Sequence, residues 1–312
     1  MKGISYRSYG GPEVLEYGEL PDPKLAPDCV LVKVKAAAVN PVDWKCQAGY
    51  LDGFLDAMFP VVPGWDVSGV VLQPGVSVKE FSEGDEVVGY VRKDVLGQGT
   101  FAEYVAAPVR TLARKPTALT FEEACTLPLA GLTAYQALSR WLGVGEGDDV
   151  LIHGAAGAVG GFAVQLALQF GARPIGAARP RDLATVRALG AVPVAYEEDL
   201  SGFAAAVRAV APRGVTAALD TLGGPFLAAT AELLAPGGSL ASIADASVLG
   251  MGGHYVFVRP DAADLQAVSD LAQAGTLTAR VAESYPLAKA ADAQRRAMAG
   301  GLRGGKVVVT VD

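Results

Sequence analysis

Apolar and polar residues alternate in short runs over roughly the first third of the chain. The segment VLVKVK places Val30, Val32 and Val34 on one side of an extended strand, as expected for a strand with one buried face. Turn-forming pairs such as Pro74-Gly75 separate these runs. Many short strands with glycine and proline between them predict a small barrel or curled sheet. The expected strands lie at 30–35, 67–72, 86–90 and 101–106.

The pattern changes after Pro116, where short β-branched strands begin to alternate with helices rich in alanine and leucine. In one helix, Val159, Ala163, Leu166 and Phe170 recur with a period near 3.6 and share one face. This alternation predicts a doubly wound parallel sheet with strands at 150–152, 174–177, 217–219, 240–243 and 255–258. A final strand at 306–311 follows, and periodicity alone leaves open whether it returns to the first domain.

Composition and charge narrow the class of protein. The 312 residues suffice for two domains, and 51% hydrophobic against 19% charged residues excludes a disordered chain. A net charge of −7 argues against a broad phosphate-binding surface, so we expect no nucleic-acid partner. No apolar run is long enough for a signal peptide or a membrane span, and three scattered cysteines give no disulfide framework. We therefore expect a cytoplasmic protein with no membrane partner.

A glycine-rich segment between the strand at 150–152 and the next helix predicts a dinucleotide-binding turn. Its side chains are absent or small, so the backbone can approach a pyrophosphate, and the start of the helix provides amide donors. A tight turn without a ligand is the alternative, but strand, turn and helix stand in the order that this motif requires. The residues are Gly154, Ala155, Ala156, Gly157, Ala158, Val159 and Gly160.

The end of the second strand in this domain predicts which dinucleotide binds. An NAD site places an Asp or Glu there, to bond the ribose hydroxyls. This chain has Arg179 and Arg181 instead, and arginine grips a 2′-phosphate through its planar guanidinium. We therefore expect NADPH (NADP), and two solvated loop arginines are the alternative.

Seven motifs are spread over nearly the whole chain: GGPEVL at 10–15, AVNPVD at 38–43, PGWDVSG at 63–69, GTFAEY at 99–104, LAGLTAY at 129–135, AAGAVG at 155–160 and GGKVV at 304–308. Together they resemble the zinc-independent quinone and enone reductases of the medium-chain dehydrogenase/reductase superfamily. The resemblance implies an α/β plus β fold, in which a GroES-like β-barrel catalytic domain (1–118 plus 281–312) carries an inserted Rossmann NADPH-binding domain (119–280). It also implies a homodimer, often joined through the last Rossmann strand, here Tyr255 to Val258.

The positions of the metal ligands in zinc-dependent relatives predict that no metal is bound here. The Gly-His-Glu triplet of those relatives corresponds to Gly64-Trp65-Asp66, so the imidazole is missing. A catalytic zinc needs three protein ligands, and neither His153 nor His254 has partners at ligand spacing. We interpret the nearby Cys46 as an ordinary small side chain.

Without a metal, reduction of an activated alkene or a quinone is easier than alcohol oxidation, because the acceptor forms a stabilised enolate or hydroquinone anion. We expect an NADPH-dependent enzyme that transfers hydride to an α,β-unsaturated carbonyl or to a quinone. The resemblance implies that Asn40 lies beside the nicotinamide and the bound carbonyl, and that Lys45 and Tyr50 supply a hydrogen bond or a proton. A turn-closing Asn and two surface residues are the structural alternatives.

Six further residues match family positions near the cofactor or the substrate. The cofactor set is Thr133, Ser242, Val256 and Phe257, and the substrate pocket is lined by Trp65 and Tyr255. We interpret Asp220, which follows a strand, as a structural anchor.

Two other functions remain open on the same residues. One is an enoyl reductase or reductive cyclase that tailors a biosynthetic intermediate. The other is a non-catalytic NADPH-binding protein, which would bind the dinucleotide without oxidising it.

Overall fold

The computed structural model describes residues 1–197 and 199–311, which form two compact units. The first comprises Met1–Leu129, Arg259–Gly275 and Ala279–Asp312, and the second comprises Ala130–Val258 and Thr276–Thr278. Glu198 and Asp312, which the expected domain boundaries include, lie outside the described residues. Residues 119–129 and 259–275 were expected in the Rossmann domain and group here with the first unit. No helix in the described part of the chain is both long and apolar enough to cross a membrane.

A seven-stranded sheet dominates the first unit. Its order is β16-β17-β3-β5-β6-β9, with β8 paired to β3. The strands are β3 (Cys29–Ala38), β5 (Asp66–Pro74), β6 (Glu86–Tyr90), β8 (Tyr104–Pro108), β9 (Leu112–Arg114), β16 (Val281–Pro286) and β17 (Lys306–Thr310). Two small sheets pair β1 (Lys2–Ser5) with β2 (Glu16–Glu19) and β4 (Asp56–Ala57) with β7 (Val95–Leu96).

The alternation that predicted the strand around residue 32 is confirmed. Val30, Val32 and Val34 are completely buried in the core, and each such side chain stabilises the fold by about 1.5–3 kcal/mol. The strand expected at 101–106 begins later, at Tyr104. Phe101 instead receives a hydrogen bond from the Ile4 amide (2.8 Å), which ties the N-terminal strand to this loop.

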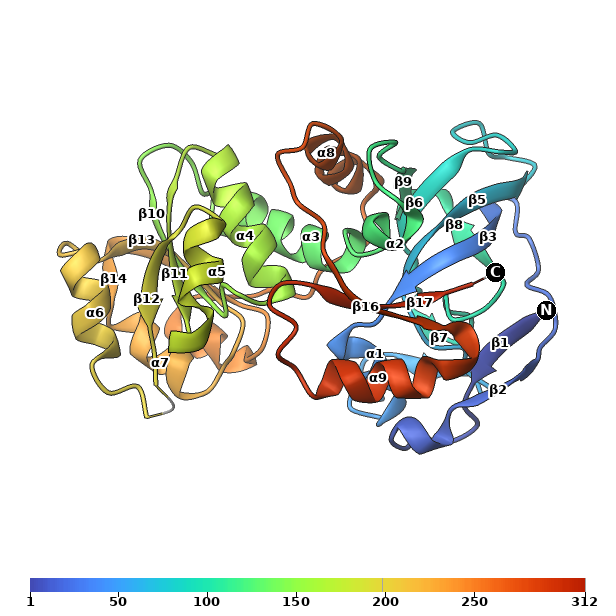
Figure 1. The fold of residues 1–312 in the computed structure, drawn as a ribbon, viewed down its shortest axis with the longest axis horizontal. Helices are drawn as coiled ribbons and strands as arrows, with labels where there is room; N and C mark the ends of the chain where they lie inside the picture. Colours follow the sequence, from blue (N-terminus) through green and yellow to red (C-terminus); the bar gives the residue numbers. More distant parts are fainter. Residues whose placement is uncertain (198, 312) are drawn as a thin grey trace. The chain divides into compact units, whose positions relative to one another are not determined.

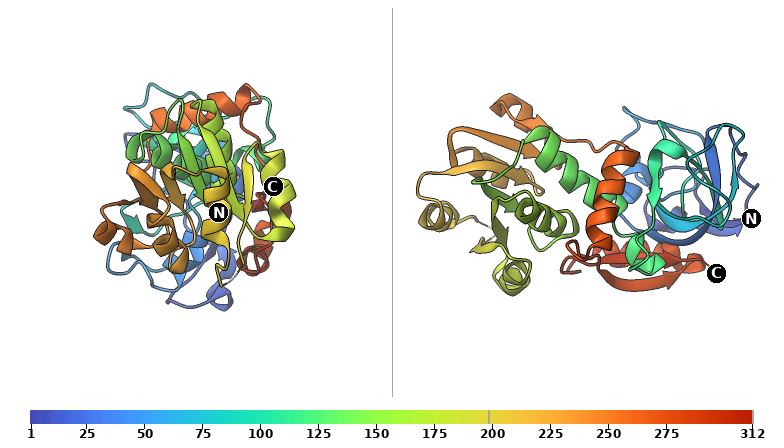
Figure 2. Two further views of the ribbon diagram at one scale, coloured as in Figure 1. Left: turned by 90° about the vertical axis from the view of Figure 1, so that its left-hand side faces the viewer. Right: turned by 90° about the horizontal axis from the view of Figure 1, so that it is seen from above.

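The last strand returns to the first unit. β17 pairs antiparallel with β3, with Val308 opposite Ala38 and Thr310 opposite Ala36. Figures 1 and 2 show this red strand beside the blue β3. Residues at the two ends of the sequence therefore share one sheet.

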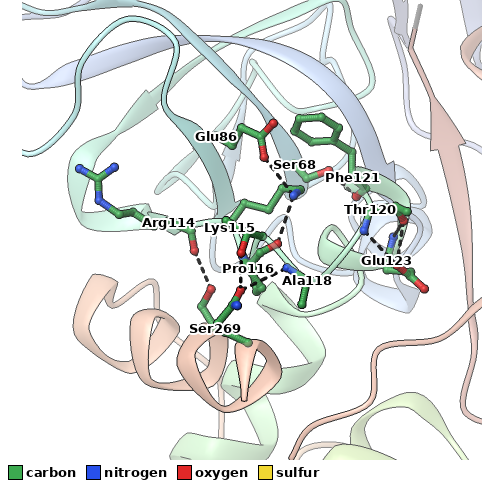
Figure 3. A network of polar contacts seen from close by, with 12 residues as sticks. Ser68, Glu86, Arg114, Lys115, Pro116, Ala118, Thr120, Phe121, Glu123 and Ser269 are labelled. Atoms are coloured by element: carbon green, nitrogen blue, oxygen red, sulfur yellow. Dashed lines mark hydrogen bonds and ion pairs between the residues drawn. The ribbon is translucent and has the colours of Figure 1, made fainter. Parts of the chain in front are cut away.

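Five helices begin in the first unit: α1 (Pro41–Gln47), α2 (Phe121–Ala124), α3 (Pro128–Gln136), α8 (Ala262–Gln273) and α9 (Ala290–Met298). Helix α8 docks on β9, because Ser269 Oγ donates to the Arg114 carbonyl (2.6 Å), as Figure 3 shows. The Arg114 amide also donates to Gln266 of this helix (3.0 Å). Beside this contact, Lys115 Nζ lies 3.0 Å from a Glu86 carboxylate oxygen. These bonds explain why residues 259–275 group with the barrel-like unit.

The second unit is a six-stranded parallel sheet in the order β12-β11-β10-β13-β14-β15. Figure 1 shows α4 and α5 on one face and α6 and α7 on the other. The strands are β10 (Asp149–His153), β11 (Arg173–Ala178), β12 (Val192–Ala195), β13 (Val215–Asp220), β14 (Leu234–Ser242) and β15 (His254–Tyr255). The helices are α4 (Ala158–Gln169), α5 (Leu183–Ala188), α6 (Phe203–Val210) and α7 (Pro225–Ala231), and a π-helical turn (Ala137–Trp141) continues α3.

The doubly wound parallel sheet predicted from strand–helix alternation is thus confirmed, with differences in its outer strands. β15 covers only His254–Tyr255, not 255–258, although the Val256 amide still donates to the Ser242 carbonyl (2.8 Å). The predicted strands include none at the position of β12, which contains Pro193. It lies at the edge of the sheet, where a missing amide donor is tolerated.

Candidate functional site

The turn at residues 154–160, called the phosphate turn below, joins β10 to α4 in the second unit. Gly154 has φ +59°, a left-handed conformation that favours glycine. A Cβ on Gly160 would lie 2.2 Å from the Gly154 carbonyl oxygen, so only glycine fits there. Among the described residues, no side chain caps α4 at Gly157, which leaves the first amides of the helix to an anion. The backbone thus has the shape that a pyrophosphate requires.

A second feature of this unit is an open pocket of about 580 Å³ at the ends of β11 and β12, called the arginine pocket. Arg179 and Arg181 line it together with Tyr196. Burial raises the pKa of the Tyr196 phenol, and the two guanidinium groups oppose this rise. Glu197 and Asp199 also line the pocket, and Asp199 accepts the Ser201 amide proton (2.9 Å).

The structure therefore brings together the two arginines that the sequence singled out. It adds Tyr196, which sequence reasoning missed although it directly follows a strand of the sheet. The Tyr196 amide donates to the Ala178 carbonyl (3.1 Å), which fixes the phenol beside the arginine-bearing strand end.

A hydrogen-bond network holds the strand ends next to the phosphate turn. The buried Asp220 carboxylate accepts the amides of Leu222 and Gly223 (both 3.0 Å) and the Ser242 hydroxyl (2.6 Å). Asp220 thus anchors the backbone after β13 to the end of β14. The Ser242 hydroxyl, expected near the nicotinamide, is engaged with this carboxylate.

Buried His153 ends β10 directly before the phosphate turn. Its Nε2 lies 2.7 Å from the Thr230 hydroxyl, which itself donates to the Phe226 carbonyl, so Nε2–H is assigned as the donor to Thr230. Burial lowers the pKa of His153 to about 4, against the raising effect of Asp220, so the ring is neutral at ordinary pH. His153 therefore packs in the core, as a neutral ring, next to the phosphate turn.

The other expected contact residues of the second unit differ in exposure. Thr133 in α3 and Val256 after β15 are buried, Tyr255 is half-buried, and Phe257 is 43% exposed. All four lie in the same unit as the phosphate turn.

The first unit holds a cluster of buried polar side chains from three distant segments, Asn40, Asp66 and Lys306, called the Lys306 cluster. Lys306 Nζ donates to Asp66 Oδ2 (2.6 Å) and to Asn40 Oδ1 (2.7 Å). Asn40 Nδ2 donates to Asp66 Oδ2 (2.9 Å) and to the Ala38 carbonyl (3.3 Å). Each residue is at most 4% exposed, so the carboxamide of Asn40 is fixed in orientation by a buried ion pair.

Sequence reasoning had selected Asn40 but neither partner as functional. A signal was present, because Lys306 is a charged residue that opens a run of three buried valines in β17. Buried charges are rare unless they are paired, so such a lysine points to a carboxylate elsewhere in the fold.

Helix α1 carries the remaining candidates. Asp43 Oδ2 accepts a hydrogen bond from the backbone N–H of Asn40 (2.7 Å). Lys45 lies on the exposed side of the helix. Tyr50, beyond the end of α1, is 75% exposed. Lys45 and Tyr50 are therefore accessible to a ligand, whereas Asn40 is buried in the Lys306 cluster.

Trp65 is 7% exposed and packs edge-to-face on Tyr90, with ring centroids 5.9 Å apart. It lines a small cavity together with Tyr6, Asp43 and Cys46, called the Asp43 cavity. Burial raises the pKa of Cys46 to about 12, so its thiol stays protonated. In the described part of the chain, no three His, Cys, Asp or Glu side chains are grouped as metal ligands would be.

Two family models match the chain: an alcohol dehydrogenase GroES-like domain over residues 26–117 and a zinc-binding dehydrogenase over 189–309. The chain is 41% identical over 198 residues to the NADPH-dependent alkenal/one oxidoreductase of Arabidopsis thaliana. This match covers 61% of the chain and 51% of the Arabidopsis protein. Matches to the first curated relatives span 47 to 59% of their length.

Solved structures match over the whole length. The quinone oxidoreductase of Coxiella burnetii has a TM-score of 0.87 and 31% identity, covering 100% of this chain and 99% of its own. A mycobacterial protein in complex with NADPH has a TM-score of 0.85 and 30% identity, covering 100% of both chains. The expected GroES-like and Rossmann-like fold is confirmed. The chain belongs to the quinone and enone oxidoreductase branch of the medium-chain dehydrogenase/reductase superfamily.

Proposed function

We propose that this protein is an NADPH-dependent reductase that adds hydride to an α,β-unsaturated carbonyl compound or a quinone. The observation that carries the proposal is the combination of the phosphate turn with the arginine pocket in one unit. The names of the relatives support the same reaction class.

The residues fit the dinucleotide. The phosphate turn would hold the pyrophosphate through the amides of α4, because Gly154 and Gly160 keep the backbone free of side chains. Arg179 and Arg181 would bind the 2′-phosphate, with Tyr196 beside them. Bound NADPH would supply the hydride.

We also propose that the reaction needs no zinc. The side chain at position 65 is an indole, and Asp66 is already paired with the Lys306 ammonium at 2.6 Å. A metal would have to displace that ammonium and would still lack the three protein ligands of a catalytic zinc.

For the catalytic side chains we retain Asn40, Lys45 and Tyr50. Both amide protons and the oxygen of Asn40 are used within its own unit, so its role would be to present a fixed surface to the ring and the carbonyl. Exposed Lys45 and Tyr50 are free to donate to the developing oxyanion.

A homodimer in the cytoplasm, without nucleic-acid or membrane partners, completes the proposal. β15 is the edge strand of its sheet, and apolar side chains stand exposed around it, among them Leu249 (62%) and Phe257 (43%). Sedimentation velocity should show a dimer, and a monomer at micromolar concentration would contradict this part.

The decisive experiment is a panel of small enones, 2-alkenals and quinones assayed with NADPH and with NADH. Removing the 2′-phosphate partners in Arg179→Ala and Arg181→Ala should weaken NADPH binding by about 10-fold or more each and leave NADH binding nearly unchanged. Arg187→Ala, an exposed arginine of α5 outside the pocket, is the matched control. Equal rates with NADH would contradict the cofactor assignment. NADPH binding without oxidation by any acceptor would favour the non-catalytic alternative.

A further inference from the structure

We propose that Asp43 and the Asp43 cavity form the proton store of this reductase: the protonated carboxyl group supplies, through a water molecule held in the cavity, the proton that hydride addition requires. The inference rests on the proposed reductase function and assigns a role to a residue that the family motifs leave without one.

The geometry begins with the position of Asp43 in the first turn of α1. Its Oδ2 accepts the Asn40 amide proton at 2.7 Å, as part of the cap of the helix. Its Oδ1 is buried and has no hydrogen-bond partner among the described residues. A buried carboxyl oxygen without a partner costs free energy unless it carries a proton or meets a water molecule.

The cavity beside Asp43 can hold such a water molecule. Its volume of about 20 Å³ is enough for one ordered water, which requires roughly 10–15 Å³ and two to four polar partners. Asp43, Tyr6, Cys46, Lys93 and Gln98 provide polar groups on its wall, and the Trp65 ring also lines it.

The charges around Asp43 favour its neutral form. Burial raises the pKa of its carboxyl group to about 8, and the Asp66 carboxylate adds to this, against the hydrogen bond from Asn40 N–H and the Lys306 ammonium. That ammonium is bonded to Asp66 and Asn40 and so leaves Asp43 without an ion-pair partner.

The remaining titratable groups around Asp43 and its cavity are Tyr6, Cys46, Tyr90 and Lys93. Burial raises the pKa of the two phenols and of the thiol, so these three groups remain neutral together with the carboxyl group. Burial lowers the pKa of the Lys93 ammonium on the cavity wall.

The step balances in charge and atoms. Hydride addition to the β-carbon of an enone leaves an enolate anion, which needs one proton to become the saturated carbonyl product. The O–H bond of Asp43 breaks, the proton passes to the cavity water, and a proton of that water forms the new bond to the enolate. Asp43 is left as a carboxylate and takes its next proton from bulk solvent. The backbone amide of Asn40, the residue proposed to lie beside the carbonyl, donates to Asp43 Oδ2, so the store is adjacent to that residue.

A spectroscopic test needs no turnover. Infrared difference spectra of the wild-type protein should show the carbonyl band of a protonated carboxylic acid at pH 7, which is lost as the pH rises through about 8 and is absent in Asp43→Asn. Asn can still accept the Asn40 amide bond, and Asp28→Asn, at an exposed carboxylate of the same unit, should leave the band intact. An Asp43 that is ionised at pH 7 would overturn the proton store.

The kinetic test asks whether that proton is used. With the best enone, wild-type kcat should fall as the pH rises through about 8, because only protonated Asp43 can donate. Asp43→Asn should lower kcat at pH 7 on the order of 100-fold and abolish that inflection, with the Kd for NADPH unchanged. Unchanged kcat and pH profile would overturn the role.

The two failures can be told apart. If Asp43→Asn does not fold, the wild-type band and wild-type kcat must still titrate with one midpoint, and different midpoints overturn the proposal. A protein that turns over no enone or quinone contradicts the proposed function. Turnover by a protein that lacks the Asp43 band contradicts the proton store alone.

Discussion

The phosphate turn of the second unit is built from backbone groups, whereas the Lys306 cluster of the first unit is built from side chains. The turn consists of backbone groups exposed by missing side chains, all within seven consecutive residues. The cluster consists of three charged or polar side chains that come from positions 40, 66 and 306. A backbone site is fixed by local conformation, whereas a side-chain site depends on the completed fold and on mutual compensation of buried charge.

The largest effect should come from breaking the side-chain site. Lys306→Met leaves the Asp66 carboxylate buried without its cation, and we expect a loss of about 3–5 kcal/mol in the free energy of unfolding. Urea unfolding measures this loss. The double variant Lys306→Met/Asp66→Asn removes both charges and should recover part of it. If the double variant is as unstable as the two single losses added together, charge compensation is not what holds the cluster.

Lowering the pH should have an intermediate effect on the free energy of unfolding. It acts through His153, whose side chain supports the phosphate turn of the second unit. The folded pKa of about 4 lies below the unfolded value of about 6.5, so the unfolded state binds the proton first as the pH falls. The contribution of neutral His153 to the free energy of unfolding is thus complete above pH 6.5. It is lost as the pH falls to 4, a change on the order of 3 kcal/mol. Urea unfolding at several pH values measures it.

His153→Gln is the matched variant, because the amide can still donate to Thr230 but does not titrate. Its stability should depend less on pH than that of the wild type between pH 6.5 and 4. Parallel curves for the two proteins would show that His153 does not bind the proton that destabilises the fold.

The smallest of the three effects tests the backbone site by adding one methyl group. Gly160→Ala places a Cβ 2.2 Å from the Gly154 carbonyl oxygen, so the turn must shift, and we expect the Kd for NADPH to rise about 100-fold. Gly161→Ala, the next residue of α4, would meet its first neighbour, Leu189, at 3.6 Å and should bind normally. Equal Kd values for the two variants, measured by fluorescence titration, would show that the turn does not bind the cofactor through its backbone.

The same contrast explains what could be predicted from the sequence. The phosphate turn and the strand around Val32 were predictable because each pattern lies within about ten residues and is read by the local backbone. The partners of Asn40 were not, because 26 residues separate it from Asp66 and 266 from Lys306. Periodicity could not give the position of β17 either, since a run of valines satisfies any buried sheet, and only the family resemblance placed this strand in the first domain.

The pairing of β17 with β3 has a consequence for the order in which the protein is made. The ribosome releases residues 130–258 while the strand that borders β3 is still to be synthesised, so the nucleotide-binding unit can complete its sheet first. Until residue 306 emerges, Asp66 has no ammonium partner, and the nascent barrel carries a carboxylate that disfavours burial. The final strand thus brings the cation that compensates a carboxylate synthesised 240 residues earlier.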